Sequence, residues 1–273
     1  MRILLINPNT SRAMTAKIAD AAREVAAPDA EITAVCPDPG RGPAAVESHV
    51  DEVAAAAAVI ELIRADLATG GSDAYVIACF GDPGLDAARE LVDVPVVGIA
   101  EAAMHVAAIA GRRFAIVTTL GRTLGRARDL VARYGMGSAC VQYRAVEIPV
   151  LDLEEATPET IAAIERECRD AVEAPAGEAA DAIVLGCAGM ADLCTLLSAR
   201  VGAPVIDGVA AAVGLAAAMV RMGVRTGTRG EYAPPPLRKH ERNDASIASS
   251  EGPGRAAAEL SHPMAREAAL WQM

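Results

Sequence analysis

Two cysteines stand at equivalent places in a segment that the chain contains twice. The first copy reads DAYVIAC and ends at Cys79, and the second reads DAIVLGC and ends at Cys187, so each cysteine follows an apolar run of strand length. A second apolar run follows each copy at similar spacing, VPVVG at 94–98 and APVID at 203–207. Because ligands of open α/β sheets bind at the carboxyl ends of strands, we expect both thiols to face one ligand.

Two thiols on opposite sides of a substrate carbon could take a proton from one face and return a proton to the other. A free thiol has a pKa near 8.5, and the positive end of a helix favours the thiolate. Small residues that open a helix-like pattern follow both cysteines, so we expect both thiols at helix N-termini. The pair then predicts general acid–base catalysis with inversion at a carbon next to a carbonyl. A lone cysteine at a strand end more often packs in the core, but its occurrence in both copies of the repeat favours catalysis.

Such a reaction forms an enolate, whose oxygen needs hydrogen-bond donors. The backbone N–H groups directly after the cysteines are the candidates: those of Phe80, Gly81, Ala188 and Gly189. Asn9 closes the first strand of the chain, and Thr118 and Thr119 close its counterpart in the second half. These three side chains are expected either to bind the ligand or to cap the next helix.

Strand-like and helix-like patterns alternate along the chain, which predicts parallel sheets covered by helices. Strands are expected near 2–6, 31–35, 74–79, 95–98, 113–118, 181–186 and 204–206. Helices are expected near 12–26, 47–68, 83–91, 101–109, 122–134, 158–173, 190–200 and 208–222. Asp82-Pro83 and Thr157-Pro158 are each expected to place a cap and a first-turn proline at a helix start.

The duplication predicts an α/β fold of two pseudo-symmetric parallel-sheet halves with the active site at their interface. The first half is expected over 1–110 and contains Cys79; the second is expected over 111–225 and contains Cys187. The last helix of the second half is a candidate to pack on the first half. Residues 226–273 carry proline-rich, charged and Ser/Gly-rich stretches without a sustained period, so a disordered tail is expected there.

Composition narrows the class of protein and its compartment. Hydrophobic residues make up 52% of the chain and aromatic residues only 3%, so the core must be built from Ala, Val, Ile and Leu. A net charge of −11 argues against nucleic-acid and anionic-membrane partners. No apolar stretch is long enough to span a membrane, and the N-terminal apolar run is too short for a signal peptide. We therefore expect a cytoplasmic protein.

The spacing of the cysteines and histidines gives no sign of a metal site. The six cysteines form no C-x-x-C pair, and the four histidines are scattered along the chain. Reduced thiols are expected in the cytoplasm, and the four cysteines outside the repeat are expected to pack in the core.

Five motifs together resemble the hydantoin racemase family, which includes allantoin racemase and belongs to the aspartate/glutamate racemase superfamily. They are INPNTS at 6–11, VIACFGDPGL at 76–85, GIAEAAM at 98–104, IVTT at 116–119 and IVLGCAGM at 183–190. The resemblance covers about residues 1–225 and implies a two-base racemase without a cofactor, with Cys79 and Cys187 as the acid/base pair. It also implies a homo-oligomer and a small-molecule substrate, a 5-substituted hydantoin.

The residues after each cysteine bear on the substrate. Amino-acid racemases of the superfamily carry Asn-Thr and Thr-His-type residues there, whereas this chain has Phe-Gly and Ala-Gly. An apolar wall with backbone donors suits a neutral planar ring better than a zwitterion. The leading hypothesis is racemisation of 5-substituted hydantoins, allantoin among them. The alternatives are an aspartate or glutamate racemase, an isomerase or decarboxylase that forms a related enolate, and a non-catalytic small-molecule binding protein.

Overall fold

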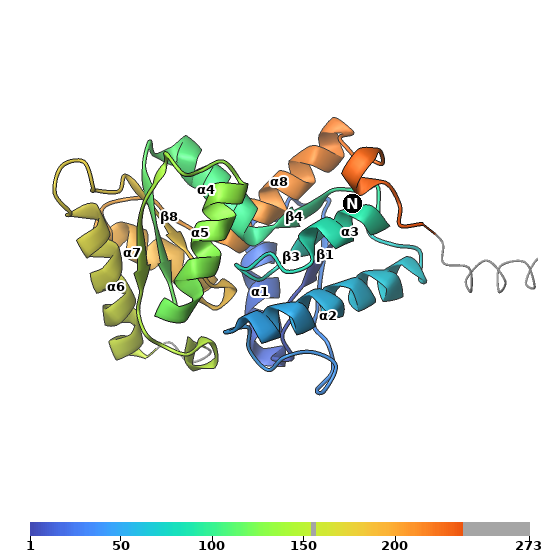
Figure 1. The fold of residues 1–273 in the computed structure, drawn as a ribbon, viewed down its shortest axis with the longest axis horizontal. Coiled ribbons are helices and arrows are strands. Elements are labelled where there is room, and N and C mark those ends of the chain that lie inside the picture. The colour runs from blue at the N-terminus through green and yellow to red at the C-terminus, as the bar shows by residue number, and fades with distance from the viewer. Residues whose placement is uncertain (154–156, 237–273) are drawn as a thin grey trace, which may run out of the picture. The chain divides into compact units, whose positions relative to one another are not determined.

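Two parallel sheets with the same strand order underlie the fold (Figure 1). The computed structural model describes residues 1–153 and 157–236. The first sheet has the order β2-β1-β3-β4 and consists of β1 (Arg2–Ile6), β2 (Glu31–Val35), β3 (Ala74–Ile77) and β4 (Val96–Gly98). The second has the order β6-β5-β7-β8 and consists of β5 (Phe114–Thr118), β6 (Cys140–Ala145), β7 (Ala182–Leu185) and β8 (Val205–Ile206). The predicted α/β class with two similar halves is confirmed.

Helices connect successive strands and cover the sheets, as parallel pairing requires. The α-helices are α1 (Arg12–Val25), α2 (His49–Leu67), α3 (Leu85–Leu91), α4 (Ile99–Ala110), α5 (Leu124–Arg133), α6 (Pro158–Val172), α7 (Cys194–Val201) and α8 (Gly208–Met222). The 3-10 turns are η1 (Gly121–Thr123), η2 (Val150–Leu153), η3 (Ala188–Leu193) and η4 (Gly230–Tyr232). No helix in the part of the chain that the structure describes has the length and apolar character needed to cross a bilayer.

Strand β6 is the element that the sequence does not predict. It lies at the edge of the second sheet, next to β5, and its polar side chains conceal its strand character. Those side chains bind α6: Arg144 Nε donates to Glu167 Oε2 at 2.8 Å, and Gln142 Nε2 donates to the Ala171 carbonyl at 3.0 Å. The polar side chains of β6 therefore bind a helix and do not only face solvent.

One predicted helix start is confirmed and one is wrong. Thr157 caps α6, its side chain accepting a hydrogen bond from the N–H of Thr160, and Pro158 occupies the first turn. The predicted cap at Asp82 does not start α3, which begins after Gly84 in the left-handed region at φ 73°. Asp82 also has a positive φ, 45°, and its side chain accepts hydrogen bonds from the first turn of α4 instead.

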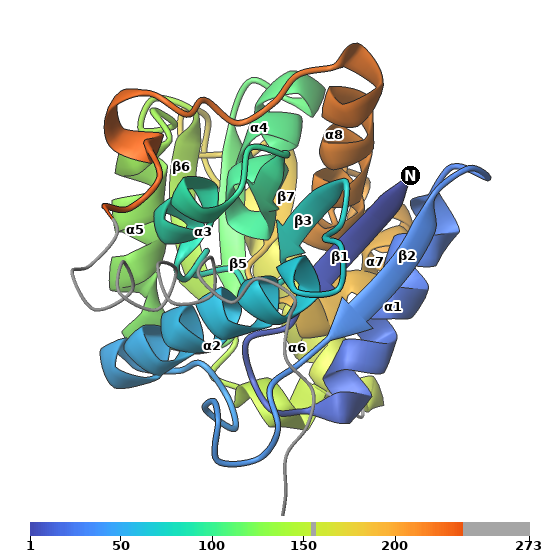
Figure 2. The ribbon, with the colours of Figure 1, turned by 90° about the vertical axis from the view of Figure 1, so that its right-hand side faces the viewer.

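Helices α4 and α8 each pack against the sheet of the other half (Figures 1 and 2). Met104 of α4 shares a core with Ile116 of β5 and Val184 of β7. Val213 of α8 shares a core with Val76 of β3. Neither sheet is covered without a helix from the other half, which is the reason that residues 1–234 form one compact unit.

The prediction of a disordered tail from residue 226 is wrong for residues 226–234, which belong to the compact unit. Thr226 donates through its N–H to the Asp93 carbonyl at 2.9 Å and through its hydroxyl to the Val94 carbonyl at 2.7 Å. The Tyr232 hydroxyl donates to Asp86 of α3 at 3.1 Å. The rest of the predicted tail, residues 237–273, lies outside the described residues.

Candidate active site

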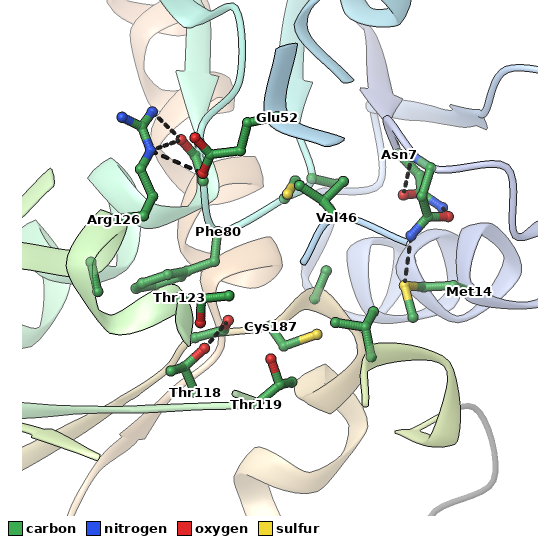
Figure 3. Close-up of a pocket in the computed structure, with 18 residues that line it drawn as sticks. Asn7, Met14, Val46, Glu52, Phe80, Thr118, Thr119, Thr123, Arg126 and Cys187 are labelled. Carbon is green, nitrogen blue, oxygen red and sulfur yellow. Dashed lines mark hydrogen bonds and ion pairs between the residues drawn. The ribbon is translucent and has the colours of Figure 1, made fainter. Parts of the chain in front are cut away.

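Cys79 and Cys187 occupy equivalent places, each two residues beyond the end of a central strand. Cys79 follows β3 and Cys187 follows β7, and both line one pocket (Figure 3). The pocket encloses about 70 Å³, far below the roughly 300–1,000 Å³ of pockets for drug-sized ligands. The structure therefore brings the two predicted thiols to one site of a size for a small ligand.

A backbone N–H two residues after each cysteine hydrogen-bonds its sulfur. The donor is Gly81 for the first thiol and Gly189 for the second. Close packing favours glycine at both places: a Cβ would lie 3.1 Å from Glu52 Oε1 at the first and 3.2 Å from Met14 Cε at the second. Gly81 lines the pocket, whereas Gly189 lies behind the second thiol rather than in the lining.

Burial raises the pKa of both thiols. It raises the pKa of Cys79 to about 12, where the nearby N–H opposes the rise and charge on Cys187 adds to it. It raises the pKa of Cys187 to about 11, with a further contribution from Glu47. The expectation that both thiols lie at α-helix N-termini is wrong, because α3 begins only at Leu85 and the element that follows Cys187 is a 3-10 turn. Burial therefore disfavours the thiolate at both sites, and loss of one proton opposes loss of the other.

The three predicted polar side chains reach the pocket but differ in their hydrogen bonds. Asn9 Oδ1 accepts from Asn7 Nδ2 at 2.8 Å, and its Nδ2 is 3.3 Å from Met14 Sδ. Thr118 is committed to the fold, because its hydroxyl donates to the carbonyl of Gly186 at 3.0 Å. The buried Thr119 points its hydroxyl into the pocket beside the second thiol (Figure 3). Asn9 and Thr119 can therefore still donate to a ligand.

Apolar side chains form the wall between the polar ends of the pocket. Phe80 and Ala188, both predicted, line it together with Val46 and Val150. Phe80 is buried against α4 and α5, the helices with which it shares a core, and this packing fixes its ring.

A charged pair, Glu52 and Arg126, also lines the pocket, and the sequence does not predict it. Arg126 Nε lies 3.2 Å from Glu52 Oε1, and Arg126 Nη2 donates to the Gly81 carbonyl at 2.6 Å. Burial raises the pKa of Glu52, while the charge of Arg126 opposes that rise. Each residue is one charged side chain within an amphipathic helix, so only the three-dimensional fold places them together.

Asp82 ties the segment after Cys79 to the second half. Its carboxylate accepts from the N–H groups of Ala100 and Glu101 at 3.1 and 2.9 Å, which makes it the cap of α4. The Tyr134 hydroxyl at the end of α5 donates to the same carboxylate at 2.7 Å. Burial raises the pKa of Asp82 to about 6, and the Tyr134 hydroxyl opposes this rise.

The remaining cysteines do not line the pocket. Cys140, Cys168 and Cys194 are buried in the core as predicted, whereas the same prediction is wrong for Cys36, which is partly exposed. All six cysteines are free thiols. Within residues 1–153 and 157–236, no group of three His, Cys, Asp or Glu side chains is placed to hold a metal ion.

Comparison with known proteins identifies the family. The sequence model described as Asp/Glu/Hydantoin racemase matches residues 3–216. The chain belongs to this family of racemases. It is 43% identical to a hydantoin racemase from Pseudomonas sp. (strain NS671) over 240 residues, which cover 88% of this chain and 94% of that one. Its enzyme class is therefore that of an isomerase.

Two solved structures of the family are similar in fold and sequence. An allantoin racemase from Klebsiella pneumoniae matches with a TM-score of 0.83 and 47% identity, covering 87% of this chain and 95% of that one. An allantoin racemase from Pseudomonas fluorescens matches with a TM-score of 0.82 and 38% identity, covering 88% and 99%. The resemblance stated from the motifs is confirmed at the level of the family.

Proposed function

We propose that this racemase inverts 5-substituted hydantoins at C5 by proton transfer to and from the thiols of Cys79 and Cys187. The observation that carries the proposal is the placement of two thiols at equivalent strand ends on one small pocket. Relatives named hydantoin racemase and allantoin racemase support the substrate class. The hydantoin C5 lies next to the C4 carbonyl, which acidifies its proton.

The reaction begins with one thiol and one thiolate. The thiolate removes the C5 proton, and the electron pair of the C5–H bond moves to the C4 carbonyl oxygen to form an enolate. The opposite thiol then gives its proton to the other face of C5, and the electron pair returns to form the new C–H bond. The product has the inverted configuration, and the two sulfurs have exchanged protonation states, so proton exchange with solvent must reset the enzyme.

The high thiol pKa values fit this scheme. A C5 proton is only weakly acidic, and a base whose pKa is raised to about 11 or about 12 is a strong proton acceptor once deprotonated. Coupling between the two sulfurs favours a singly deprotonated pair over a doubly deprotonated one. That state is the one that the two-base mechanism requires.

The hydrogen-bond donors and apolar side chains that line the pocket suit a neutral hydantoin ring. The Asn9 amide and the Thr119 hydroxyl are positioned to donate to the enolate oxygen, while Phe80 and Val46 offer apolar surface to a planar ring. Arg126 is a cation of the lining, but it is paired with Glu52 and with the Gly81 carbonyl. An α-carboxylate bound there would lie beside the Glu52 carboxylate, whose negative charge opposes its binding.

We also propose that the enzyme works in the cytoplasm as a homo-oligomer. Six free thiols support a reducing compartment. On α2, Val50 and Val53 leave 79% and 74% of their surface exposed, which supports association of copies through that helix. Analytical ultracentrifugation tests the second statement: wild type should sediment as an oligomer, and a monomer at micromolar concentration would contradict it.

The activity is tested by proton NMR in D₂O on single enantiomers of allantoin and 5-benzylhydantoin. Loss of the C5–H signal and decay of optical rotation should both be faster with enzyme than in the enzyme-free control, which corrects for spontaneous exchange at C5. Acceleration of neither process for either compound would overturn the proposed substrate class. Enzyme-dependent exchange of aspartate or glutamate would favour amino-acid racemisation instead.

A further inference from the structure

The pocket has polar groups at two opposite ends, with the thiols between them. Asn7 lies at one end, and Glu52 and Arg126 lie at the other, beyond Phe80 (Figure 3). The asymmetry is chemical as well: the first end offers the amide of Asn9, which is hydrogen-bonded to Asn7, whereas the second offers a carboxylate beside a guanidinium. A substrate with two different ends has one orientation that satisfies both.

Glu52 has acceptor capacity left over. Within the described residues, its carboxylate contacts Arg126 Nε at 3.2 Å and the exposed His49 ring at 3.9 Å. A carboxylate can accept about four hydrogen bonds, so these contacts leave lone pairs free on a side chain that lines the pocket. The Glu52 side chain is 21% exposed, so most of its desolvation has already occurred on folding and does not have to accompany ligand binding.

The two-base geometry fixes where a 5-substituent must point. Hydrogen leaves and enters C5 along the line between the two sulfurs, so the ring and the substituent occupy the directions across that line. The C4 carbonyl has to meet the donors Asn9 and Thr119. The substituent leaves C5 on the side opposite the ring, toward Glu52 and Arg126, and it keeps this direction in both enantiomers.

We propose, on the basis of the proposed function, that Glu52 accepts a hydrogen bond from an N–H of the 5-substituent. Arg126 holds the carboxylate in place and donates to a substituent carbonyl. The preferred substrates are then hydantoins with a urea-like 5-substituent, as in allantoin, rather than 5-aryl or 5-alkyl hydantoins. An aryl group at this end would shield the charged pair from water without giving it a hydrogen bond. Leaving charged groups desolvated and unsatisfied costs more binding free energy than the loss of some contact area does.

The test compares kcat/KM for allantoin and 5-benzylhydantoin in wild type and in Glu52→Gln and Glu52→Leu. Wild type should prefer allantoin by at least about tenfold, as expected for one hydrogen bond to a charged group. Glu52→Leu should lose at least about tenfold on allantoin and be unchanged or improved on 5-benzylhydantoin. Glu52→Gln keeps one acceptor oxygen and should fall between the two.

Glu61→Gln is the matched control, because Glu61 lies on the same helix in an exposed ion pair with Arg41. It should leave the ratio of the two kcat/KM values unchanged. Two results would overturn the inference: a wild-type preference for 5-benzylhydantoin, or an equal loss on both substrates in Glu52→Leu, which would make Glu52 a support for Arg126 alone. Failure of wild type on both compounds would instead overturn the proposed function.

Discussion

Arg126 holds the carbonyl of Gly81 with two hydrogen bonds, at 2.6 Å from Nη2 and 3.2 Å from Nε. The N–H of the same glycine donates to the sulfur of Cys79. A residue from the second half of the fold therefore anchors the glycine whose N–H favours the Cys79 thiolate in the first half. This places Arg126 as a positioning residue for Cys79.

Replacement of Arg126 should weaken the Cys79 thiolate specifically. In Arg126→Met the Gly81 carbonyl loses its two donors and the glycine is held less firmly, so the pKa of Cys79 should rise further while that of Cys187 stays the same. We expect a cost of about 1.5–3 kcal/mol in the free energy of unfolding. Alkylation of each cysteine as a function of pH, followed by mass spectrometry, measures the selective effect.

Two further variants control this experiment. Arg126→Lys keeps a charge and one donor and should recover part of the Cys79 reactivity. Arg12 lies in an exposed ion pair with Asp38, so Arg12→Met should change stability by less than about 1 kcal/mol. Equal slowing of both cysteines in Arg126→Met would show a general loss of packing instead of a positioning role.

The raised thiol pKa values predict how alkylation depends on pH. With pKa values of about 12 for Cys79 and about 11 for Cys187, the thiolate fraction grows about tenfold per pH unit across the neutral range. The rate of iodoacetamide alkylation at each site should therefore rise without a plateau from pH 7 to pH 9.5. A cysteine peptide with an ordinary pKa, about 8.5, levels off in the same range. A plateau at either site below pH 9 would contradict the assignment, whatever the absolute rate.

The raised pKa of Asp82 predicts that part of the stability of the fold depends on pH. Its pKa in the fold, about 6, exceeds the 3.8 of the unfolded chain, so the folded state takes up the proton first as the pH falls. This difference in pKa contributes about 3 kcal/mol to the free energy of unfolding. The contribution is fully present below pH 4 and is lost as the pH rises through 6. Tyr134→Phe removes a donor to the charged carboxylate and should cost about 1.5–3 kcal/mol at pH 7.5 but only about 1 kcal/mol at pH 5.

Urea denaturation of Tyr134→Phe at the two pH values measures this difference. Tyr232→Phe is the control, because the Tyr232 hydroxyl donates to Asp86, whose pKa Arg133 holds low despite partial burial. Asp86 is ionised at both pH values, so the control should show the same cost at each. A cost for Tyr134→Phe that is equal at both pH values or larger at pH 5 would contradict the account of Asp82.

Gly186 is packed too closely for a side chain. A Cβ there would lie 2.7 Å from Thr118 Cβ and 3.2 Å from its Cα, and a backbone atom cannot move aside as a flexible side chain can. Gly186→Ala should cost about 1–3 kcal/mol and displace the neighbouring Cys187, with a large loss of racemase activity. Gly125→Ala on α5 meets nothing within 4 Å and should leave activity unchanged. Wild-type stability and activity in Gly186→Ala would contradict the packing argument.

Most helices and strands could be predicted from the sequence because their apolar residues recur with a clear helical or strand periodicity. Strands β1, β2 and β5 and helix α8 lie within a residue of their expected bounds. Strand β6 could not be predicted, because its polar side chains serve α6 rather than solvent alone. The packing of α8 on the first half is among the expectations, whereas the packing of α4 on the second sheet depends on contacts between halves, which local patterns do not encode.

The candidate site could be predicted where it follows strand ends and not where it comes from helix faces. The repeat locates Cys79 and Cys187 because parallel strands of duplicated units end at equivalent places. Glu52 and Arg126 each lie on an amphipathic helix among other charged residues, and only the approach of α2 to α5 brings them together. The pKa values of the thiols depend on burial, which the sequence around a cysteine does not reveal.

Single replacements of the two cysteines test whether both are needed. Cys79→Ser and Cys187→Ser should each lose racemisation by about a hundredfold or more, because a serine hydroxyl is a much weaker acid than a thiol. Circular dichroism should show that both variants fold. Cys168→Ser serves as a control for thiol loss outside the pocket and should affect stability more than activity. Full activity in either pocket variant would contradict the paired-thiol site.

The most direct test of the two-base mechanism is isotope incorporation during the first few per cent of turnover in D₂O. A single enantiomer of the substrate is used, and chiral chromatography with mass spectrometry separates unreacted substrate from product. With two thiols, the product carries deuterium at C5 from the second thiol, while the remaining substrate keeps its hydrogen. Deuterium that appears in the unreacted enantiomer as fast as in the product would mean that one base serves both faces, and it would contradict the central claim.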